Sequence, residues 1–154
     1  IDTGARRSEI AGLQLEDIDW NHKVAVVLGK GGRRRACPFG KKTAAALDRY
    51  IRVRRQHRDA DVPELWLGKT GVLTSNGIYQ VFRRRSTQAG LDKAYPHLFR
   101  HGFAHSWLAN GGGETDLMAL TGWRSRTMLG RYAASAAADR AREAYQRLSP
   151  GDRL

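Results

Sequence analysis

The chain has 154 residues, of which 27 are Lys or Arg and 15 are Asp or Glu, so its formal net charge at neutral pH is +12. This length is enough for one domain with a single buried core. No apolar run approaches the roughly 18 residues that a membrane-spanning helix needs. The single cysteine, Cys37, excludes an internal disulfide. We therefore expect one cytoplasmic domain without a membrane partner, whose excess positive charge suits a polyanion such as a nucleic acid.

The first half of the chain predicts a helix, a β-hairpin and a second helix. Apolar residues follow a helical spacing from Glu9 to Asp17. Two strands are expected at 23–30 and 33–39, because the first is rich in valine and glycines separate the two. Residues 42–57 again carry apolar side chains at helical spacing, and residues 65–67 are a candidate third strand.

The second half of the chain predicts helices only. The signals are residues that cap helices, a proline that opens one, a glycine that closes one, and an alanine-rich tail. The expected helices are one from Thr74 or Ser75 to near Gly90, one from Pro96, a short one closed by Gly122, and one over 133–148. Together with the first half, this predicts one α+β domain over residues 1–154. It is mainly α-helical, with a small three-stranded antiparallel sheet.

Two runs of three consecutive arginines concentrate the positive charge. They are Arg33, Arg34 and Arg35 in the expected hairpin, and Arg83, Arg84 and Arg85 in the expected helix after Ser75. A run of this kind can be a solvated face or a set of phosphate contacts. Because several basic clusters occur in one small domain, we take these six residues as candidates for DNA binding.

The stretch His97-Leu98-Phe99-Arg100-His101, with His105 one turn later, poses a choice between a cation site and an anion site. Histidines four residues apart share one flank of a helix, which is a spacing that metal sites use. The guanidinium of Arg100 among them would repel a metal ion. It offers instead a fork of N–H donors that fits two phosphate oxygens, and a neighbouring histidine can exchange a proton near neutral pH. The stretch therefore favours a phosphodiester. On the same helix, Phe99, Phe103 and Trp107 form a stripe that we expect in the core.

Two further places are candidates for chemistry. Arg6 and Glu9, three residues apart, can be a plain surface ion pair or part of a site. Lys30 lies between Gly29 and Gly31 at the hairpin tip, where the glycines allow the tip to move and to approach another backbone closely.

Five short motifs occur in an order that resembles the catalytic domain of the tyrosine recombinase (phage integrase) family. They are Thr3-Gly4-Ala5-Arg6-Arg7-Ser8-Glu9, Gly29-Lys30-Gly31-Gly32, His97-Leu98-Phe99-Arg100-His101, Thr121-Gly122-Trp123 and Arg131-Tyr132-Ala133. The resemblance extends over nearly the whole chain. Each motif is short, but the ordered set is specific.

The resemblance implies a role for each matching position. Arg6 and Arg100 would clamp the scissile phosphate, Lys30 and His97 would move protons, Trp123 would pack and hydrogen-bond near the phosphate, and Tyr132 would be the nucleophile. Glu9 would orient Arg6 or a neighbouring histidine. The resemblance further implies cleavage and rejoining of DNA strands through a covalent 3'-phosphotyrosine, with neither a metal nor another cofactor and without ATP.

The chemistry of a phosphodiester agrees with these roles. Negative charge gathers on the non-bridging oxygens in the transition state, so two fixed guanidinium groups stabilise it more than the ground state. A tyrosine hydroxyl, with an ordinary pKa of about 10, needs a positive surrounding and a base such as His97 to attack. Tyr132 is favoured over Tyr145 because it follows Trp123 by nine positions, as the resemblance requires.

The resemblance also sets expectations for the whole protein. The family more often has histidine where Trp123 stands, and an indole N–H can donate a hydrogen bond but cannot take up a proton. We expect the chain to be a fragment that lacks an amino-terminal DNA-binding domain and the first helices of the catalytic domain. Its partner would be double-stranded DNA. The protein would work as a homotetramer whose carboxy-terminal tail docks on a neighbouring subunit, and would associate with the nucleoid in a bacterial or phage-derived setting.

Three alternatives remain open on the sequence alone. A type IB topoisomerase uses similar chemistry but acts as a monomer. A basic module without activity would explain the charge but not five motifs in order. A metal nuclease would explain the histidines but not Arg100.

Overall fold

The computed structural model of the protein describes residues 2–29 and 31–153. Its elements, in chain order, are α1 (Arg7–Ala11), a 3₁₀ turn η1 (Leu15–Asp17), β1 (Ile18–Asp19), β2 (Val24–Leu28), β3 (Arg34–Pro38), α2 (Lys41–Arg54), β4 (Leu67–Gly68), β5 (Gly71–Val72), α3 (Ser75–Gln88), α4 (Pro96–Ala109), α5 (Glu114–Thr121), α6 (Arg126–Leu148) and a final turn η2 (Gly151–Arg153). The expected class, mainly helical with a small three-stranded antiparallel sheet, is confirmed.

A first buried cluster lies between the β1-β2-β3 sheet and α2. Side chains alternate across a strand, so Ala25 and Val27 of β2 point inward while their neighbours are more exposed. The pairing of β2 with β3 places Ala25 opposite Cys37, which is also fully buried. Leu47 from α2 and Leu65 from the loop before β4 complete the packing. The cluster fixes the sheet beneath the amino-terminal turn of the chain.

The third strand of the sheet is Ile18–Asp19, so the expectation of a strand at residues 65–67 is wrong. Strand β4 begins at Leu67 and pairs only with β5, in a separate two-stranded ribbon. The preceding residues bind α1 and the loop after it instead, because the Leu65 N–H donates to Leu13 O at 2.8 Å and the Trp66 indole N–H donates to Ile10 O at 2.8 Å.

The first helix is also shorter than expected, since α1 ends at Ala11 and not at Asp17. Its chain turns at Gly12, and the N–H of Leu15 then donates to Pro63 O at 2.9 Å. Residues 12–17, which the apolar spacing predicted to be helical, therefore form backbone hydrogen bonds with the distant segment 63–65 instead. The other expected helices are present, and α6 begins earlier, at Arg126, with Ser125 as its cap.

A second buried cluster joins α4, α5 and α6. Its centre consists of Ala104, Leu108, Leu117 and Leu129. The aromatic stripe of α4 is only partly buried and lies at the margin of this core, so Arg100, Ala104 and Leu108 form the most buried line of the helix instead. The stripe is nevertheless packed, since aromatic rings contact one another along it.

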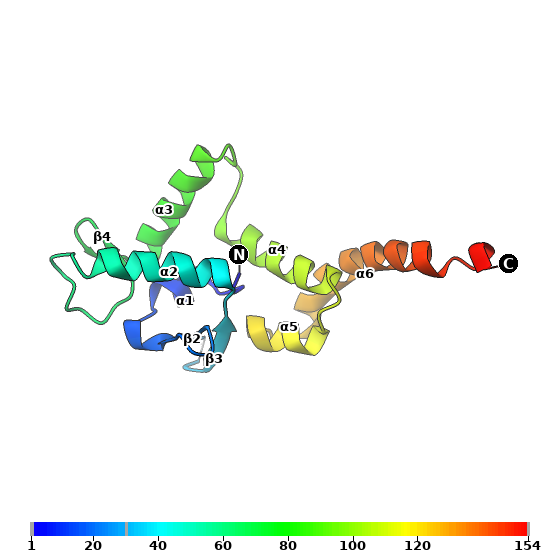
Figure 1. Ribbon diagram of the computed structural model, residues 1–154, viewed down its shortest axis with the longest axis horizontal. Coiled ribbons are helices and arrows are strands. Elements are labelled where there is room, and N and C mark those ends of the chain that lie inside the picture. The colour runs from blue at the N-terminus through cyan, green and yellow to red at the C-terminus, as the bar shows by residue number, and fades with distance from the viewer. Residues whose placement is uncertain (1, 30, 154) are drawn as a thin grey trace.

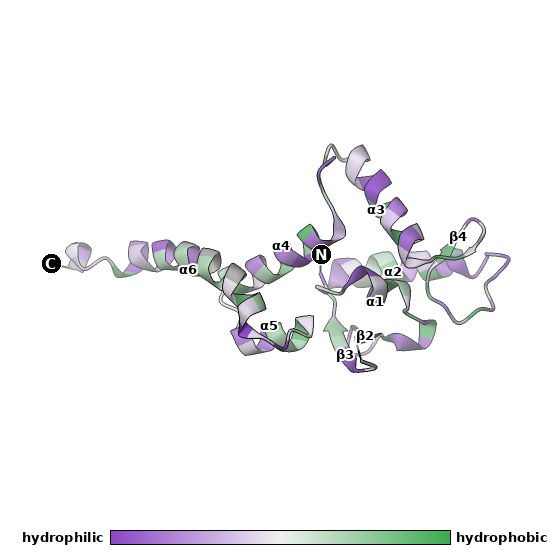
Figure 2. Ribbon diagram, turned by 180° about the vertical axis from the view of Figure 1, so that it is seen from behind, coloured by the Kyte–Doolittle hydropathy of each residue, from purple (hydrophilic) through white to green (hydrophobic). Residues whose placement is uncertain are grey.

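Figure 1 shows how these parts are arranged: the sheet, α1 and α2 lie on one side, and α4, α5 and α6 on the other. Helix α3 rises away from both groups, and α6 extends outward to the C-terminus. The hydropathy colours of Figure 2 show several strongly hydrophilic turns on α3. Within the described part of the chain, no helix combines the length and the apolar character needed to cross a membrane.

Candidate active site

Arg6 stands at the start of α1, in extended conformation, where its position is set by Glu9 one turn later. The Glu9 carboxylate accepts the backbone N–H of Arg6 at 2.6 Å and its Nη1 at 2.7 Å. An acidic side chain at this position satisfies a free N–H at the helix start. The arginine side chain remains partly exposed while the carboxylate is buried. Arg6 is therefore held by a buried group and still open to a ligand.

Glu9 is shared by two arginines from different elements. Arg35 of β3 donates Nη1 to Oε1 at 2.6 Å and Nη2 to Oε2 at 2.7 Å, in addition to the bonds from Arg6. Burial alone would raise the pKa of Glu9, but the hydrogen bonds from Arg35 and Arg6 outweigh it and hold the pKa at about 2. The carboxylate is thus ionised at every physiological pH.

Arg100 is buried in α4 and donates to two backbone carbonyls, Gly4 O from Nη1 and Thr121 O from Nη2. Gly4 has a positive φ of 56°, and a Cβ there would lie 2.5 Å from the Phe103 ring. Only glycine therefore fits where the amino-terminal turn offers its carbonyl to Arg100. Burial, together with the nearby cations Arg6 and Arg35, lowers the pKa of Arg100 to about 10.

These groups leave positive charge without full compensation. Three guanidinium groups, of Arg6, Arg35 and Arg100, surround the one carboxylate of Glu9. The lowered pKa of Arg100 shows that its charge is disfavoured by its surroundings. An anion bound here would offset that cost, so the arrangement favours a phosphate or another compact anion.

Trp123 separates the buried arginine from the predicted nucleophile. The Arg100 guanidinium lies 5.5 Å from the centre of the Trp123 ring, and the Tyr132 ring stacks on the same indole at 5.3 Å with an interplanar angle of 11°. Trp123 itself is buried. Trp123 therefore packs against both side chains, and the guanidinium gains from the ring face.

The Tyr132 hydroxyl meets a histidine, but His101 and not His97. Its oxygen contacts Nδ1 of His101, and the two rings stack with centres 5.0 Å apart. The His97 ring is 6.1 Å from that of His101, one turn earlier on α4. His101 stands next to Arg100 in the motif, but its residue type and spacing alone predicted no separate role for it. Helical spacing places His101 one turn after His97 on α4. The sequence does not show where α6 lies, and the position of α6 is what brings Tyr132 against His101.

His97 instead lines a hollow with the arginines. This hollow has a volume of about 320 Å³, and its walls include Arg6, Arg7, Tyr79, His97 and Arg100. His97 is exposed in the first turn of α4, where Pro96 opens the helix. Two predicted phosphate ligands and a predicted proton carrier thus face one space.

A second, larger hollow of about 830 Å³ adjoins the first, because Arg6 lines both. Its walls include the arginines of the hairpin, together with Trp123 and Arg124. The two hollows together are lined by arginines of the hairpin, of α4 and of the segment that leads into α1. A surface of this charge suits a polyanion better than a small neutral ligand.

The six arginines predicted to bind DNA lie in different settings. Arg33 is exposed, and Arg34 is exposed with an ion pair to Asp17 at 2.9 Å. Arg83, Arg84 and Arg85 are all exposed on α3, and Arg85 donates to the side chain of Gln88 at 2.9 Å. Arg35, in contrast, turns inward to Glu9, and its side chain is 12% exposed. Lys30 lies outside the described residues.

The histidines do not gather into a metal centre in the part of the chain that the structure describes. No group of three or more His, Cys, Asp or Glu side chains there is arranged to hold a metal ion. The third histidine of α4, His105, faces Asp139 of α6 at 3.5 Å.

Comparison with known proteins gives a consistent result. Residues 1–139 match the model of the phage integrase family. Tyrosine recombinase XerD of Mycobacterium tuberculosis (strain H37Rv) is 34% identical over 130 residues, which cover 81% of this chain and 42% of the relative. Tyrosine recombinase XerC of Corynebacterium glutamicum is 32% identical over 124 residues, covering 80% of this chain and 40% of the relative. The chain therefore spans less than half the length of these curated relatives.

Solved structures of recombinases and integrases share the fold of this chain. The crystal structure of XerA recombinase has a TM-score of 0.81 and 28% identity, and the match covers 97% of this chain and 55% of that one. The Tn1549 transposon integrase in complex with circular intermediate DNA has a TM-score of 0.73 and 26% identity, with 92% of this chain and 53% of that one covered. The family model, the relatives and the fold agree, and the chain belongs to the phage integrase family of tyrosine recombinases.

Proposed function

We propose that the protein is a site-specific recombinase that cuts and rejoins double-stranded DNA through a covalent 3'-phosphotyrosine on Tyr132. The observation that carries the proposal is the stack of Arg100, Trp123 and Tyr132, in which one indole contacts both the tyrosine ring and a buried cation that lines the same hollow as Arg6. Residues 1–154 would be the catalytic domain. The solved relatives named above include one in complex with DNA, which supports DNA as the partner.

The scissile phosphate would lie in the hollow between Arg6 and Arg100. Each guanidinium keeps N–H donors beyond those that bind Glu9 or the carbonyls of Gly4 and Thr121. As the phosphorus becomes pentacoordinate, negative charge builds on its non-bridging oxygens, and these fixed donors stabilise that charge. The guanidinium groups thereby supply the charge stabilisation that a metal ion supplies in other phosphoryl-transfer enzymes, so the proposed reaction uses no metal.

Nucleophilic attack needs the proton of Tyr132 to leave. We assign its transfer to His101, whose Nδ1 contacts the hydroxyl oxygen. The tyrosine oxygen then bonds to phosphorus, the bond from phosphorus to the 5' oxygen breaks, and that oxygen takes a proton from Lys30 or His97. Reversal of these steps rejoins the strand. Because the phosphotyrosine conserves the energy of the phosphodiester bond, rejoining requires no ATP.

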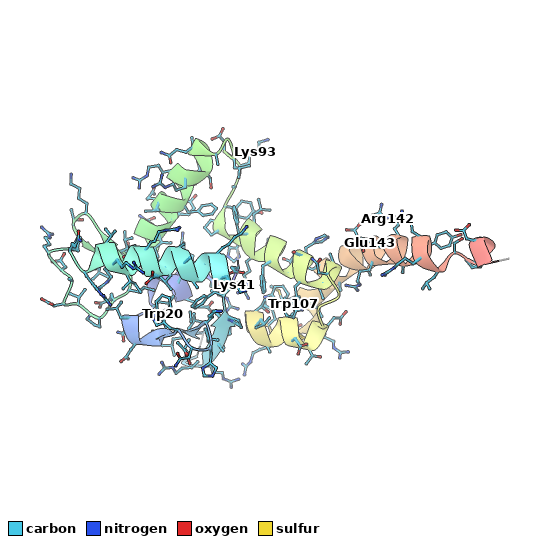
Figure 3. The ribbon with its side chains drawn as sticks, viewed as in Figure 1. Trp20, Lys41, Lys93, Trp107, Arg142 and Glu143 are labelled. Carbon is cyan, nitrogen blue, oxygen red and sulfur yellow. The ribbon has the colours of Figure 1, made fainter. Side chains whose placement is uncertain are left out.

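Assembly on DNA would use surfaces outside the hollow. Exposed arginines of α3 and the hairpin, Arg83, Arg84 and Arg85 with Arg33 and Arg34, would contact phosphates of the duplex. The outer part of α6, with Arg142 and Glu143, projects away from the rest of the molecule in Figure 3. Tyr145 and Leu148 on this part are 65% and 56% exposed. These apolar side chains support docking of the tail on a neighbouring subunit of a homotetramer.

A suicide DNA substrate tests the proposal. Such a substrate loses the cleaved end, so a covalent protein–DNA adduct accumulates and is detected by denaturing electrophoresis. The complete protein that contains this chain should form the adduct, also in the presence of a chelator, whereas Tyr132→Phe should not form it. Tyr145→Phe is the matched control, since this exposed tyrosine of the same helix should be dispensable for cleavage. An adduct on Tyr132→Phe would disprove the assignment of the nucleophile.

A further inference from the structure

Arg35 differs from the arginines beside it because all three nitrogens of its guanidinium group donate hydrogen bonds inside the protein. Two of its nitrogens donate to the two Glu9 oxygens at 2.6 and 2.7 Å. The third, Nε, donates to Leu120 O at 2.9 Å. Arg33 and Arg34 are exposed on the same hairpin. All three residues were predicted to bind DNA because they form one run of arginines. The structure separates buried Arg35 from exposed Arg33 and Arg34.

Arg35 donates to a carbonyl, that of Leu120, in the last turn of α5. The last carbonyls of a helix have no partner within it and lie at its negative end. Gly122 ends α5 in the left-handed conformation, with φ 67°, and the side chain of Arg35 passes so close that a Cβ on Gly122 would lie 3.3 Å from its Cδ. The next carbonyl, of Thr121, accepts from Arg100. One helix end thus holds two arginines side by side.

Glu9 links Arg35 to Arg6, because its carboxylate accepts hydrogen bonds from both. The same carboxylate accepts Arg6 Nη1 at 2.7 Å and Arg6 N at 2.6 Å. A planar fork that holds both oxygens fixes the direction of a carboxylate, which a single point charge does not. Without this fork, the carboxylate could rotate and carry the Arg6 guanidinium with it.

We propose that Arg35 is a positioning residue of the reaction, which orients Arg6 through Glu9 and anchors the end of α5 ahead of Trp123. The proposal rests on the role proposed above for Arg6 at the scissile phosphate. It assigns to Arg35 no contact with DNA.

The first test compares DNA binding with cleavage. Arg35→Lys keeps the charge but lacks the fork, so the complete protein should bind DNA with unchanged affinity and unchanged salt dependence. Its cleavage rate on a suicide substrate should fall by about 10- to 100-fold, the scale on which misplacement of a reacting group acts. Arg33→Ala is the matched control from the same hairpin, and should weaken binding and reduce the slope of log K against log salt by roughly 0.9. Arg35→Ala removes the same charge as Arg33→Ala but should leave the slope unchanged, and a reduction of the same size as for Arg33→Ala would overturn the proposal.

The second test separates positioning from a merely structural role. A methylphosphonate at the scissile position lacks one charged non-bridging oxygen, so the reaction should depend less on Arg6. Arg6→Ala should then be partly rescued. If Arg35 acts through Arg6, Arg35→Lys should be rescued in parallel, and rescue of Arg6→Ala alone would overturn the inference. If Arg6→Ala cleaves the normal substrate as fast as the parent, the proposed role of Arg6 fails instead.

Glu9→Asp provides a second route to the same answer if Arg35→Lys does not fold. The shorter carboxylate keeps its charge but cannot reach both arginines with the present geometry. It should show the same pattern of normal DNA binding, slower cleavage and rescue by the methylphosphonate. Slower cleavage without rescue would contradict the proposal.

Discussion

At the scale of single residues, the site depends on one buried carboxylate amid three cations. Glu9 lowers the electrostatic cost of placing Arg6 and Arg35 near Arg100, and each arginine in turn keeps Glu9 ionised. Removal of one partner of such a group leaves a buried charge uncompensated, which costs more than the pair itself contributes. The site is therefore a unit, in which a change at Glu9 affects each arginine.

The first prediction concerns stability against pH. The pKa of Glu9 is about 2 in the folded protein against 4.5 unperturbed. A lowered pKa stabilises the fold above the unfolded value, and this stability is lost as the pH falls from about 4.5 towards about 2. Over that window the parent should lose on the order of 3 kcal/mol that Glu9→Gln does not lose.

Urea unfolding at several pH values measures this difference. Asp48→Asn is the control, because Asp48 forms an exposed pair with Arg52 and such pairs contribute little. The prediction is contradicted if the Glu9→Gln and parent curves stay parallel below pH 4.5.

The second prediction concerns His101. His101→Phe keeps a stacked ring against Tyr132 but removes the proton acceptor, so cleavage should slow by about 10²- to 10⁴-fold while DNA binding persists. A fluorinated tyrosine at position 132 has a more acidic hydroxyl and should restore part of the rate. His105→Phe, one turn later on α4, is the control and should cleave normally. Loss of activity without rescue would assign to His101 a packing role only.

How far the sequence predicted the site can be judged from particular residues. Arg6, Arg100, Trp123 and Tyr132 were predicted from their motifs. In the structure, Arg6 and Arg100 line one hollow, and Trp123, between α5 and α6, lies against both Arg100 and Tyr132. The buried role of Arg35 could not be distinguished by its motif from the exposed roles of Arg33 and Arg34. Alternation along a strand separates Arg34 from its two neighbours, but the buried partner of Arg35 lies 26 residues away on another element.

At the scale of secondary structure elements, the predictions that failed were those decided by distant contacts. The spacing after Glu9 fits a helix, yet a strand-like bridge of Gln14 to Glu64 and the bond from Leu15 to Pro63 take over the backbone. Local signals were sufficient where a signal for the helix start agrees with the apolar spacing, as for the Thr74 cap of α3 and the opening Pro96 of α4. Short elements carry too little local preference to resist tertiary contacts.

The third prediction concerns the end of α5. Gly122→Ala forces a side chain into φ 67° and brings Cβ within 3.3 Å of Arg35. The substitution should destabilise the fold by about 1–2 kcal/mol, and it should also slow cleavage, because it displaces Arg35 and Trp123. Gly130→Ala, in the interior of α6 with open space around it, should be neutral or stabilising by up to about 1 kcal/mol. Thermal unfolding of both variants checks this, and equal effects would contradict it.

At the scale of the whole molecule, the two buried clusters meet at the proposed active site. Arg100 reaches from α4 to Gly4, whose neighbour Ala5 packs against the first cluster, and Arg35 reaches from the sheet to Leu120 on α5. These hydrogen bonds from arginine side chains to backbone carbonyls connect the two clusters at the place where a phosphate would bind. A small displacement of one half would therefore change the distances between Arg6, Arg100 and Tyr132, which makes the joint between the clusters part of the catalytic geometry.

The last prediction concerns the net charge of +12 and its distribution. Phosphate contacts release counterions, so affinity for duplex DNA should fall steeply between about 50 and 200 mM salt. If the exposed arginines of α3 make these contacts, replacing Arg83, Arg84 and Arg85 by alanine should reduce the slope of log K against log salt by roughly 2 to 3.

The control for this prediction removes the same charge from another face. Arg49, Arg52 and Arg55 of α2 and its end are exposed and follow a helical spacing, and their replacement by alanine should leave the slope nearly unchanged. Binding titrations over a salt series measure both slopes. Equal losses for the two triple variants would show that the total charge governs binding, because a placed set of contacts depends on which arginines are removed, whereas a diffuse field depends only on their number.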